Sequence, residues 1–169
     1  TGMALSATSL NSYINCPLQF YLTQVEQMRE PEEVQETIEA GMFGTLLHAV
    51  MENLYKPFEG KMVKKSDLEQ LYSNNLTIDR AIRSAFSEKY FLKGKNSETE
   101  LEGNYLLVAR VIRKYVKKII ETDTANTPFT YLQAEKQVKI QFSIYGGKQK
   151  VNLKGFIDRV DEREGLVRV

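Results

Sequence analysis

The spacing of apolar residues changes at Pro128, and this change constrains the fold more than any other feature of the sequence. Before Pro128 apolar residues recur three and four positions apart, as in residues 38–55, which is the spacing of an amphipathic helix. After it they alternate with polar residues, as in 138–144, which is the pattern of a half-buried strand. The sequence therefore predicts an α+β fold, helical over about 6–122 and built of antiparallel strands over about 129–169.

Several residues are typical of helix starts. Ser6 offers a capping hydroxyl to a first helix, and Ser66 to Glu69 forms a capping-box pattern for another. Thr77 is predicted to cap a third helix that runs to about Tyr90. Two polar stretches, 29–36 and 93–99, are predicted to be connections exposed to solvent.

The chain has a composition typical of a single globular domain covering residues 1–169. Apolar residues make up 42% and charged residues 27%, and no apolar run has the roughly 20 residues that a membrane span needs. One cysteine excludes an internal disulfide and fits a reducing compartment, so we expect a cytoplasmic protein without membrane attachment. The net charge of +1 gives no overall electrostatic preference for nucleic acid.

Asp158 is an acid inside a predicted strand, between a hairpin turn at 146–147 and a second predicted turn at 161–165. Aspartate is rare in strands, so such a residue usually pairs with a base, caps a turn or binds a cation. The alternative to a metal ligand is an ion pair with Lys154 or Arg159. Alternation of side chains disfavours Arg159, because neighbouring strand residues point to opposite faces.

His48, the only histidine, shares one helical stripe with Gly41 and Gly44. Each glycine costs roughly 1 kcal/mol in a helix relative to alanine, so we expect a packing reason for them. The stripe is predicted to bring the helix close to another backbone. His48 is then either a histidine beside that contact or a ligand.

Other candidates have an ordinary structural interpretation beside a functional one. Cys16 before Pro17 is interpreted as a buried small apolar residue at a helix end. Glu135 opens the first predicted strand and is an edge charge or a supporting acid. The helix expected over about 100–122 carries apolar residues on one side: Leu101, Tyr105, Val108, Ile112, Tyr115 and Ile119. Five basic residues form a stripe opposite that side, which is either a solvated face or a surface that follows a DNA backbone: Arg110, Arg113, Lys114, Lys117 and Lys118.

Three segments, 6–22, 41–48 and 154–169, together resemble the RecB/AddB-like branch of the PD-(D/E)xK nuclease superfamily. KGFIDRVDEREGLVRV resembles the approach to its active site, where an aspartate ends the second core strand and a third strand carries Asp/Glu-x-Lys. The resemblance implies an incomplete restriction-endonuclease-like core in which Asp158 is the first acid. It also implies that the second acid and the lysine follow Val169, so the chain alone is expected to be inactive.

The resemblance also implies ligands. Gly44-Thr-Leu-Leu-His48 matches a Gly-x-x-x-His pattern whose histidine reaches the metal beside the aspartate, so His48 and Asp158 would bind Mg²⁺ or Mn²⁺. Cys16 matches a cysteine that, with three further cysteines downstream, holds a [4Fe–4S] cluster in many relatives. Glu135 would support the active site without touching the metal.

The function that the resemblance implies is metal-dependent cleavage of DNA in double-strand-break repair, with a helicase domain or subunit as a possible partner. One alternative is a non-catalytic relative that keeps the fold for DNA binding or scaffolding. Without the resemblance, the chain would be an α+β binding domain of unknown partner.

Overall fold

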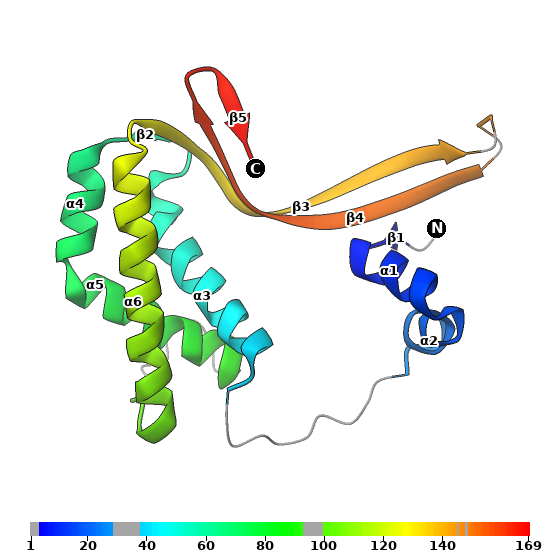
Figure 1. Cartoon of the computed structure of the whole chain (residues 1–169), viewed down its shortest axis with the longest axis horizontal. Helices are drawn as coiled ribbons and strands as arrows, with labels where there is room; N and C mark the ends of the chain where they lie inside the picture. The colour runs from blue at the N-terminus through cyan, green and yellow to red at the C-terminus, as the bar shows by residue number, and fades with distance from the viewer. Residues whose placement is uncertain (1–3, 29–37, 93–99, 145, 148) are drawn as a thin grey trace. The chain divides into compact units, whose positions relative to one another are not determined.

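The computed structural model describes residues 4–28, 38–92, 100–144, 146–147 and 149–169 (Figure 1). The two predicted connections, 29–36 and 93–99, lie outside these residues. In chain order the elements are β1 (Ala4–Leu5), α1 (Ala7–Asn15), α2 (Pro17–Phe20), η1 (Tyr21–Val25), α3 (Ala40–Tyr55), η2 (Lys56–Phe58), β2 (Lys61–Val63), α4 (Lys65–Ser73), α5 (Asn75–Ala85), η3 (Phe86–Tyr90), α6 (Gly103–Ala125), β3 (Phe129–Ile144), β4 (Gln149–Arg163) and β5 (Leu166–Arg168).

Helices precede the long strands as predicted, so the α+β class is confirmed. The strand order is β1-β4-β3-β2, with β5 also paired to β4. β2 pairs antiparallel with β3, and β5 antiparallel with β4. The short β1 pairs parallel with β4, and this two-residue strand was not predicted, because two residues show no period.

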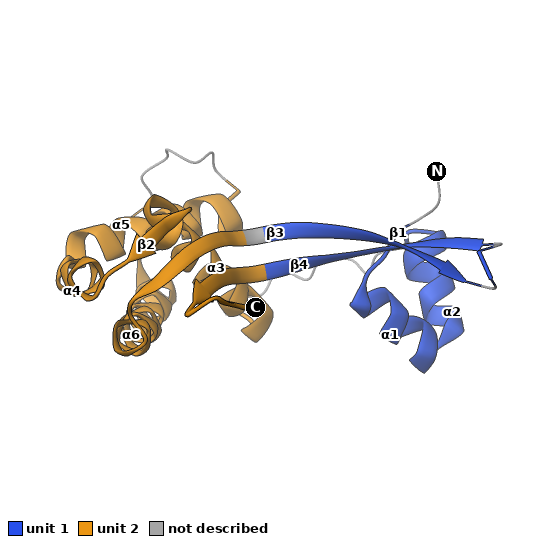
Figure 2. Ribbon diagram, turned by 90° about the horizontal axis from the view of Figure 1, so that it is seen from above, with its two compact units in different colours: residues 1–34, 135–157 blue, residues 35–134, 158–169 orange. Residues whose placement is uncertain are grey.

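The chain divides into two compact units, coloured separately in Figure 2. Unit 1 comprises residues 1–34 and 135–157, and unit 2 comprises 35–134 and 158–169. Each unit takes residues from both the helical part and the strands.

Unit 2 contains the hydrophobic core. Every buried hydrophobic side chain of the described residues lies between Leu46 and Tyr131, mainly on α3, α4, α5 and α6. The four helices lie beside one another in this unit (Figure 1). Burying one Leu or Ile side chain is worth about 1.5–3 kcal/mol, so this cluster is the main source of the unit's stability.

The buried side of α6 differs from the predicted one in its second half. Ala109, Ile112, Val116 and Ile120 are buried, whereas Tyr115, predicted to be on the apolar side, is 54% exposed. The predicted stripe repeated every 3.5 residues, and an α-helix has 3.6 residues per turn. Along the helix, the predicted apolar stripe therefore drifts away from the side that is buried.

Two predicted helix caps were wrong by a few residues. α4 begins after Lys64 instead of Ser66, and the Asp67 carboxylate accepts a hydrogen bond from the Lys64 backbone N–H at 2.9 Å. α5 begins after Asn74 instead of Thr77, because Asn74 Oδ1 accepts from the Thr77 N–H at 3.0 Å. The Ser6 cap of α1 is confirmed, with its Oγ accepting from the Ser9 N–H at 3.1 Å.

Unit 1 consists of α1, α2, η1, β1 and the greater part of the β3–β4 hairpin. The only buried residue among those described in this unit is Ser9. Among the helices of the described residues, none combines the length and the hydropathy that a membrane span needs.

The predicted close packing of the glycine stripe is wrong. A Cβ atom added at Gly41 or Gly44 would meet no atom within 4 Å. The core-facing side of α3 carries Leu46, Val50 and Leu54 instead, so the glycines lie on an open side of the helix. No contact within the described chain requires them.

We therefore expect Gly44→Ala to stabilise the protein by about 0.5–1 kcal/mol, because alanine is the better helix former and meets no clash. Gly60→Ala is the contrasting variant, because Gly60 has a φ of 72°. Alanine there should cost about 1–2 kcal/mol. Urea denaturation followed by circular dichroism measures both changes, and a destabilised Gly44→Ala variant would show that this side of α3 is packed.

Candidate metal centre beside an arginine cluster

The structure brings His48 and Asp158 together within unit 2. His48 is on α3 and Asp158 is on β4, yet His48 Nδ1 lies 3.9 Å from Asp158 Oδ2. The His48 side chain is 51% exposed and that of Asp158 is 67% exposed. The buried residues of α3 hold one face of the helix in the core and leave His48 at the surface.

The separation of the pair lies below the upper limit for two ligands of one cation. At 3.9 Å the two atoms are too far apart for a direct hydrogen bond. Two atoms bound to one ion at about 2.1 Å each can be at most about 4.2 Å apart. Nitrogen and carboxylate oxygen are both acceptable donors to Mg²⁺ or Mn²⁺, with the imidazole favouring the softer Mn²⁺. Adjacent ligands of an octahedral ion are about 3.0 Å apart, so the two exposed side chains would have to move slightly closer to share one ion.

Two protein ligands form only part of a tight site. Within the described residues no group of three or more His, Cys, Asp and Glu side chains is placed to hold a metal ion. The side chain of Glu135, the predicted supporting acid, lies outside the described residues. Its role stays a prediction.

Cys16 differs from the prediction in its burial. It lies at a helix end as expected, where its Sγ accepts from the Gln19 N–H at 3.5 Å and caps α2. The residue is exposed, however, and not buried. A [4Fe–4S] cluster needs four thiolates, and this sequence holds one cysteine, so the chain by itself does not fit a cluster.

The predicted basic stripe on α6 is partly engaged in contacts within unit 2. Arg113 forms an ion pair with Asp79 of α5. Lys117 Nζ lies 4.9 Å from the centroid of the Tyr72 ring, and Lys118 pairs with Glu121 at 2.9 Å. Of the five residues, Arg110 and Lys114 form neither an ion pair nor a cation–π contact among the described side chains.

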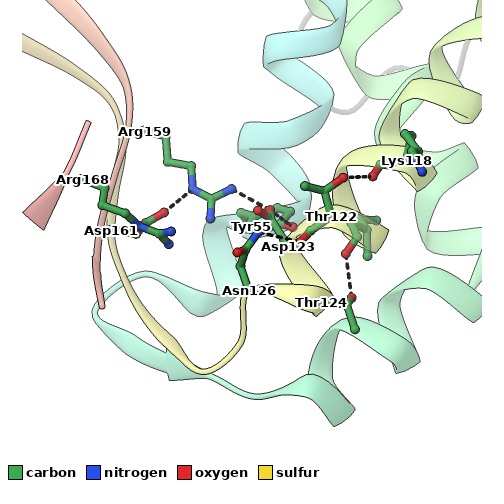
Figure 3. A network of polar contacts seen from close by, with 10 residues as sticks. Tyr55, Lys118, Thr122, Asp123, Thr124, Asn126, Arg159, Asp161 and Arg168 are labelled. Carbon is green, nitrogen blue, oxygen red and sulfur yellow. Dashed lines mark hydrogen bonds and ion pairs between the residues drawn. The ribbon is translucent and has the colours of Figure 1, made fainter. Parts of the chain in front are cut away.

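A cluster of charged side chains surrounds Arg159, the residue after Asp158. Figure 3 shows its guanidinium reaching between two carboxylates. Arg159 NH1 donates to Asp123 Oδ2 of α6 at 2.6 Å, and its Nε donates to Asp161 Oδ2 at 2.9 Å. The other oxygen of Asp161 accepts from Arg168 Nε of β5 at 2.6 Å. Tyr55 of α3 also donates its hydroxyl to Asp123 Oδ2, at 2.6 Å.

Aromatic rings enclose the same guanidinium. Its carbon lies 5.0 Å from the Phe129 ring centroid, 5.4 Å from that of Tyr55 and 5.6 Å from that of Tyr131. Burial disfavours the charged guanidinium, but the hydrogen bond from Arg159 to Asp123 and the nearby negative charges outweigh this and raise the pKa of Arg159. A planar group that stacks on rings and bonds two carboxylates has to be arginine and not lysine.

The cluster fixes the segment of β4 that carries Asp158. Arg159 and Asp161 point to one face of the strand, as alternation requires, and the intervening positions point to the other. Asp158 is thus directed away from the cluster while its backbone is held by the neighbouring anchor. An Asp158–Arg159 pair was predicted to be disfavoured, and Arg159 pairs with Asp123 and Asp161 instead.

The Arg159 cluster was not among the predicted sites, and the sequence carries one signal for it. Arg159 and Asp161 are two positions apart in a strand, so opposite charges on one face were predictable. Asp161 was assigned to a turn instead, but β4 continues to Arg163 and the turn lies at Glu164 and Gly165. Nothing in the sequence relates Asp123 on the helix to a strand that begins far along the chain.

Arg159→Met should destabilise the protein by about 3 kcal/mol, because it leaves the carboxylates of Asp123 and Asp161 in a buried setting without this partner. The same change at Arg163, whose ion pair with the exposed Glu164 is 3.7 Å long, should cost about 1 kcal/mol or less. The free energy of unfolding in urea measures both. Equal losses at the two positions would contradict a special role for Arg159.

Tyr55 and Tyr131, the two tyrosines around Arg159, are expected to make the protein less stable at alkaline pH. Burial raises the pKa of Tyr131 to about 12, and burial together with the charge of Asp123 raises the pKa of Tyr55 still further. In the unfolded chain both would titrate near about pH 10. Because the folded pKa is the higher one, their contribution is complete below about pH 10 and is lost as the pH rises towards 12 and beyond.

We expect the unfolding free energy to fall between about pH 10 and pH 12, and Tyr131→Phe to make this fall shallower. Tyr72→Phe is the control, because Tyr72 is exposed. Urea midpoints measured across this pH range decide the question. An identical pH dependence in Tyr131→Phe and the parent chain would contradict the prediction.

Comparison with known proteins adds an independent observation. A search of the curated proteins found no match. A scan against protein families matches residues 4–169 to the PD-(D/E)XK nuclease superfamily. This range includes α3 with His48, β4 with Asp158 and the whole Arg159 cluster. With a match over nearly its full length, the chain belongs to the PD-(D/E)XK nuclease superfamily.

Proposed function

We propose that the chain is part of a RecB/AddB-like nuclease domain that hydrolyses phosphodiester bonds of DNA in the cytoplasm, in double-strand-break repair. The observation that carries the proposal is the approach of His48 and Asp158 to 3.9 Å. These positions, 48 and 158, are 110 residues apart in the sequence. The family match supports a nuclease, and the pair supports metal-dependent chemistry.

His48 and Asp158 would hold a Mg²⁺ or Mn²⁺ ion. Such an ion polarises a phosphoryl oxygen and lowers the pKa of an attacking water. Both side chains are more than half exposed, so a phosphate group in solution has access to them. The carboxylate supplies the negative charge, and the imidazole adds a neutral nitrogen ligand that suits Mn²⁺ at least as well as Mg²⁺.

The position of each ligand is set by a different part of unit 2. Buried side chains of α3 fix the side of the helix that carries His48. The ion pairs of Arg159 fix the stretch of β4 that carries Asp158. Preorganised ligands of this kind lose little entropy when an ion binds.

In the proposed active site, a second acid and a lysine from an Asp/Glu-x-Lys motif would complete the metal-binding and catalytic groups around His48 and Asp158. A cluster at Cys16 would need three further cysteines. A broad visible absorbance of the intact protein would indicate such a cluster. A helicase domain or subunit is the proposed partner.

The intact protein should lose metal-dependent DNA cleavage by at least about 100-fold when Asp158→Ala or His48→Ala removes a ligand, because several kcal/mol of transition-state stabilisation come from the ion. Glu69→Ala is the matched control, since Glu69 is an exposed acid whose one ion pair among the described residues is with Lys65, at 3.8 Å. Cleavage is measured with a labelled DNA fragment in Mg²⁺, in Mn²⁺ and in chelator.

Two results would refute the proposal. Undiminished cleavage by both ligand variants would remove His48 and Asp158 from the active site. Binding of DNA by the intact protein without any cleavage in either metal would favour the alternative, a non-catalytic DNA-binding or scaffold relative of the same fold.

A further inference from the structure

Positive charge is concentrated in one short segment of the chain. Residues 136–157 contain five lysines and no acidic residue, whereas the rest of the sequence contains 18 basic and 22 acidic residues. The segment makes up the greater part of the β3–β4 hairpin in unit 1. A chain with a net charge of only +1 therefore has a strongly cationic ribbon.

The side chains of this ribbon are sorted onto two faces. Gln141 Nε2 of β3 donates to Asn152 Oδ1 of β4 at 2.9 Å, so these two side chains share a face. Because strand residues alternate, Lys139 lies on this face from β3, and Lys150, Lys154 and Phe156 lie on it from β4. The opposite face carries the apolar side chains Val138, Ile140, Phe142 and Ile144. We call the first face the lysine face.

The lysine face is open to solvent, and its lysines form no ion pair among the described residues. Lys139, Lys150 and Lys154 are exposed, and no ion pair among the described residues involves them. Lys139 lies two positions before Gln141, and Lys150 and Lys154 lie two positions either side of Asn152, so like charges gather on one face of the ribbon. Like charges brought close together destabilise a sheet.

An aromatic ring is exposed on the same face. Phe156 follows Lys154 by two positions and is 66% exposed. An exposed ring among cations is the combination that binds single-stranded nucleic acid, where the cations contact phosphates and the ring stacks on a base. Lys150 and Lys154 are about 13 Å apart along the strand, so they would reach different phosphates.

We propose that the lysine face binds single-stranded nucleic acid, with Lys139, Lys150 and Lys154 on the phosphates and Phe156 stacked on a base. The amides of Gln141 and Asn152 add hydrogen-bonding groups for the backbone. An anionic membrane fits less well, because membrane-binding surfaces place apolar residues beside the cations, and here the aliphatic side chains occupy the opposite face. The inference rests on the proposed function in taking DNA as the substrate.

The lysine variant Lys139→Gln, Lys150→Gln and Lys154→Gln tests the charge. Binding of a fluorescent mixed-sequence single-stranded oligonucleotide to the 169-residue chain is measured over a range of salt concentrations, in chelator to prevent cleavage. The slope of log affinity against log salt should become shallower by about 2, because each phosphate contact on a single strand contributes about 0.7. The control neutralises three exposed basic residues of unit 2, Lys56, Lys64 and Arg80.

Phe156→Ala tests the stacking and should change binding in a different way from the lysine variant. It should weaken binding to the single strand by at least about fivefold and leave the salt slope unchanged, since no charge is removed. Phe142→Ala is the matched control, because Phe142 is 49% exposed on the opposite face. Circular dichroism melting of each variant shows whether the fold is retained.

Each of the following results would overturn the inference. The first is that the unaltered chain fails to bind the oligonucleotide. The second is that the lysine variant keeps the salt slope of the unaltered chain, and the third is that the unit 2 control flattens that slope equally. Binding to phosphatidylserine vesicles in place of the oligonucleotide, or equal losses in Phe142→Ala and Phe156→Ala, would also exclude it. None of these measurements needs a metal ion, so failure here is distinct from failure of the proposed cleavage.

Discussion

The ion pairs of Arg159 are the interaction on which the candidate site depends. One oxygen of Asp123 accepts hydrogen bonds from both Arg159 and the Tyr55 hydroxyl. Tyr55 belongs to the helix that carries His48, and Arg159 follows Asp158 on its strand. A single carboxylate on α6 therefore links the two elements that supply the proposed ligands. Charges enclosed by rings in this way bond strongly because little water competes with them.

The sequence predicted the parts of the structure that depend on local pattern. The α+β class, the order of helices and strands and the Ser6 cap follow from hydrophobic spacing and from short-range hydrogen bonds. Errors arose where distant residues decide the outcome. The open side of α3 at Gly41 and Gly44 depends on which elements pack there. The end of β4 depends on Asp161, which pairs with Arg168 of β5 instead of starting a turn.

For the candidate site too, local patterns in the sequence were informative and contacts between distant residues were not predictable. His48 and Asp158 were chosen through a family resemblance, and the structure places them next to each other. No pattern in the sequence could identify Asp123 on α6 as the partner of Arg159. The stripe on α6 was visible as a spacing of five cations, but the partners that engage Arg113 and Lys117 come from α5 and α4. The spacing of residues predicts which of them share a face of a helix. It does not predict which other elements contact that face.

The separation of the two proposed ligands along the chain has a consequence for protein synthesis. α3 leaves the ribosome long before β4, and domains begin to fold from the N-terminal side as they emerge. His48 can therefore take its place in a folded helix while Asp158 has not yet been added. The two side chains can approach each other only after β4 has been made, so a nascent chain that ends before Asp158 cannot form the proposed pair.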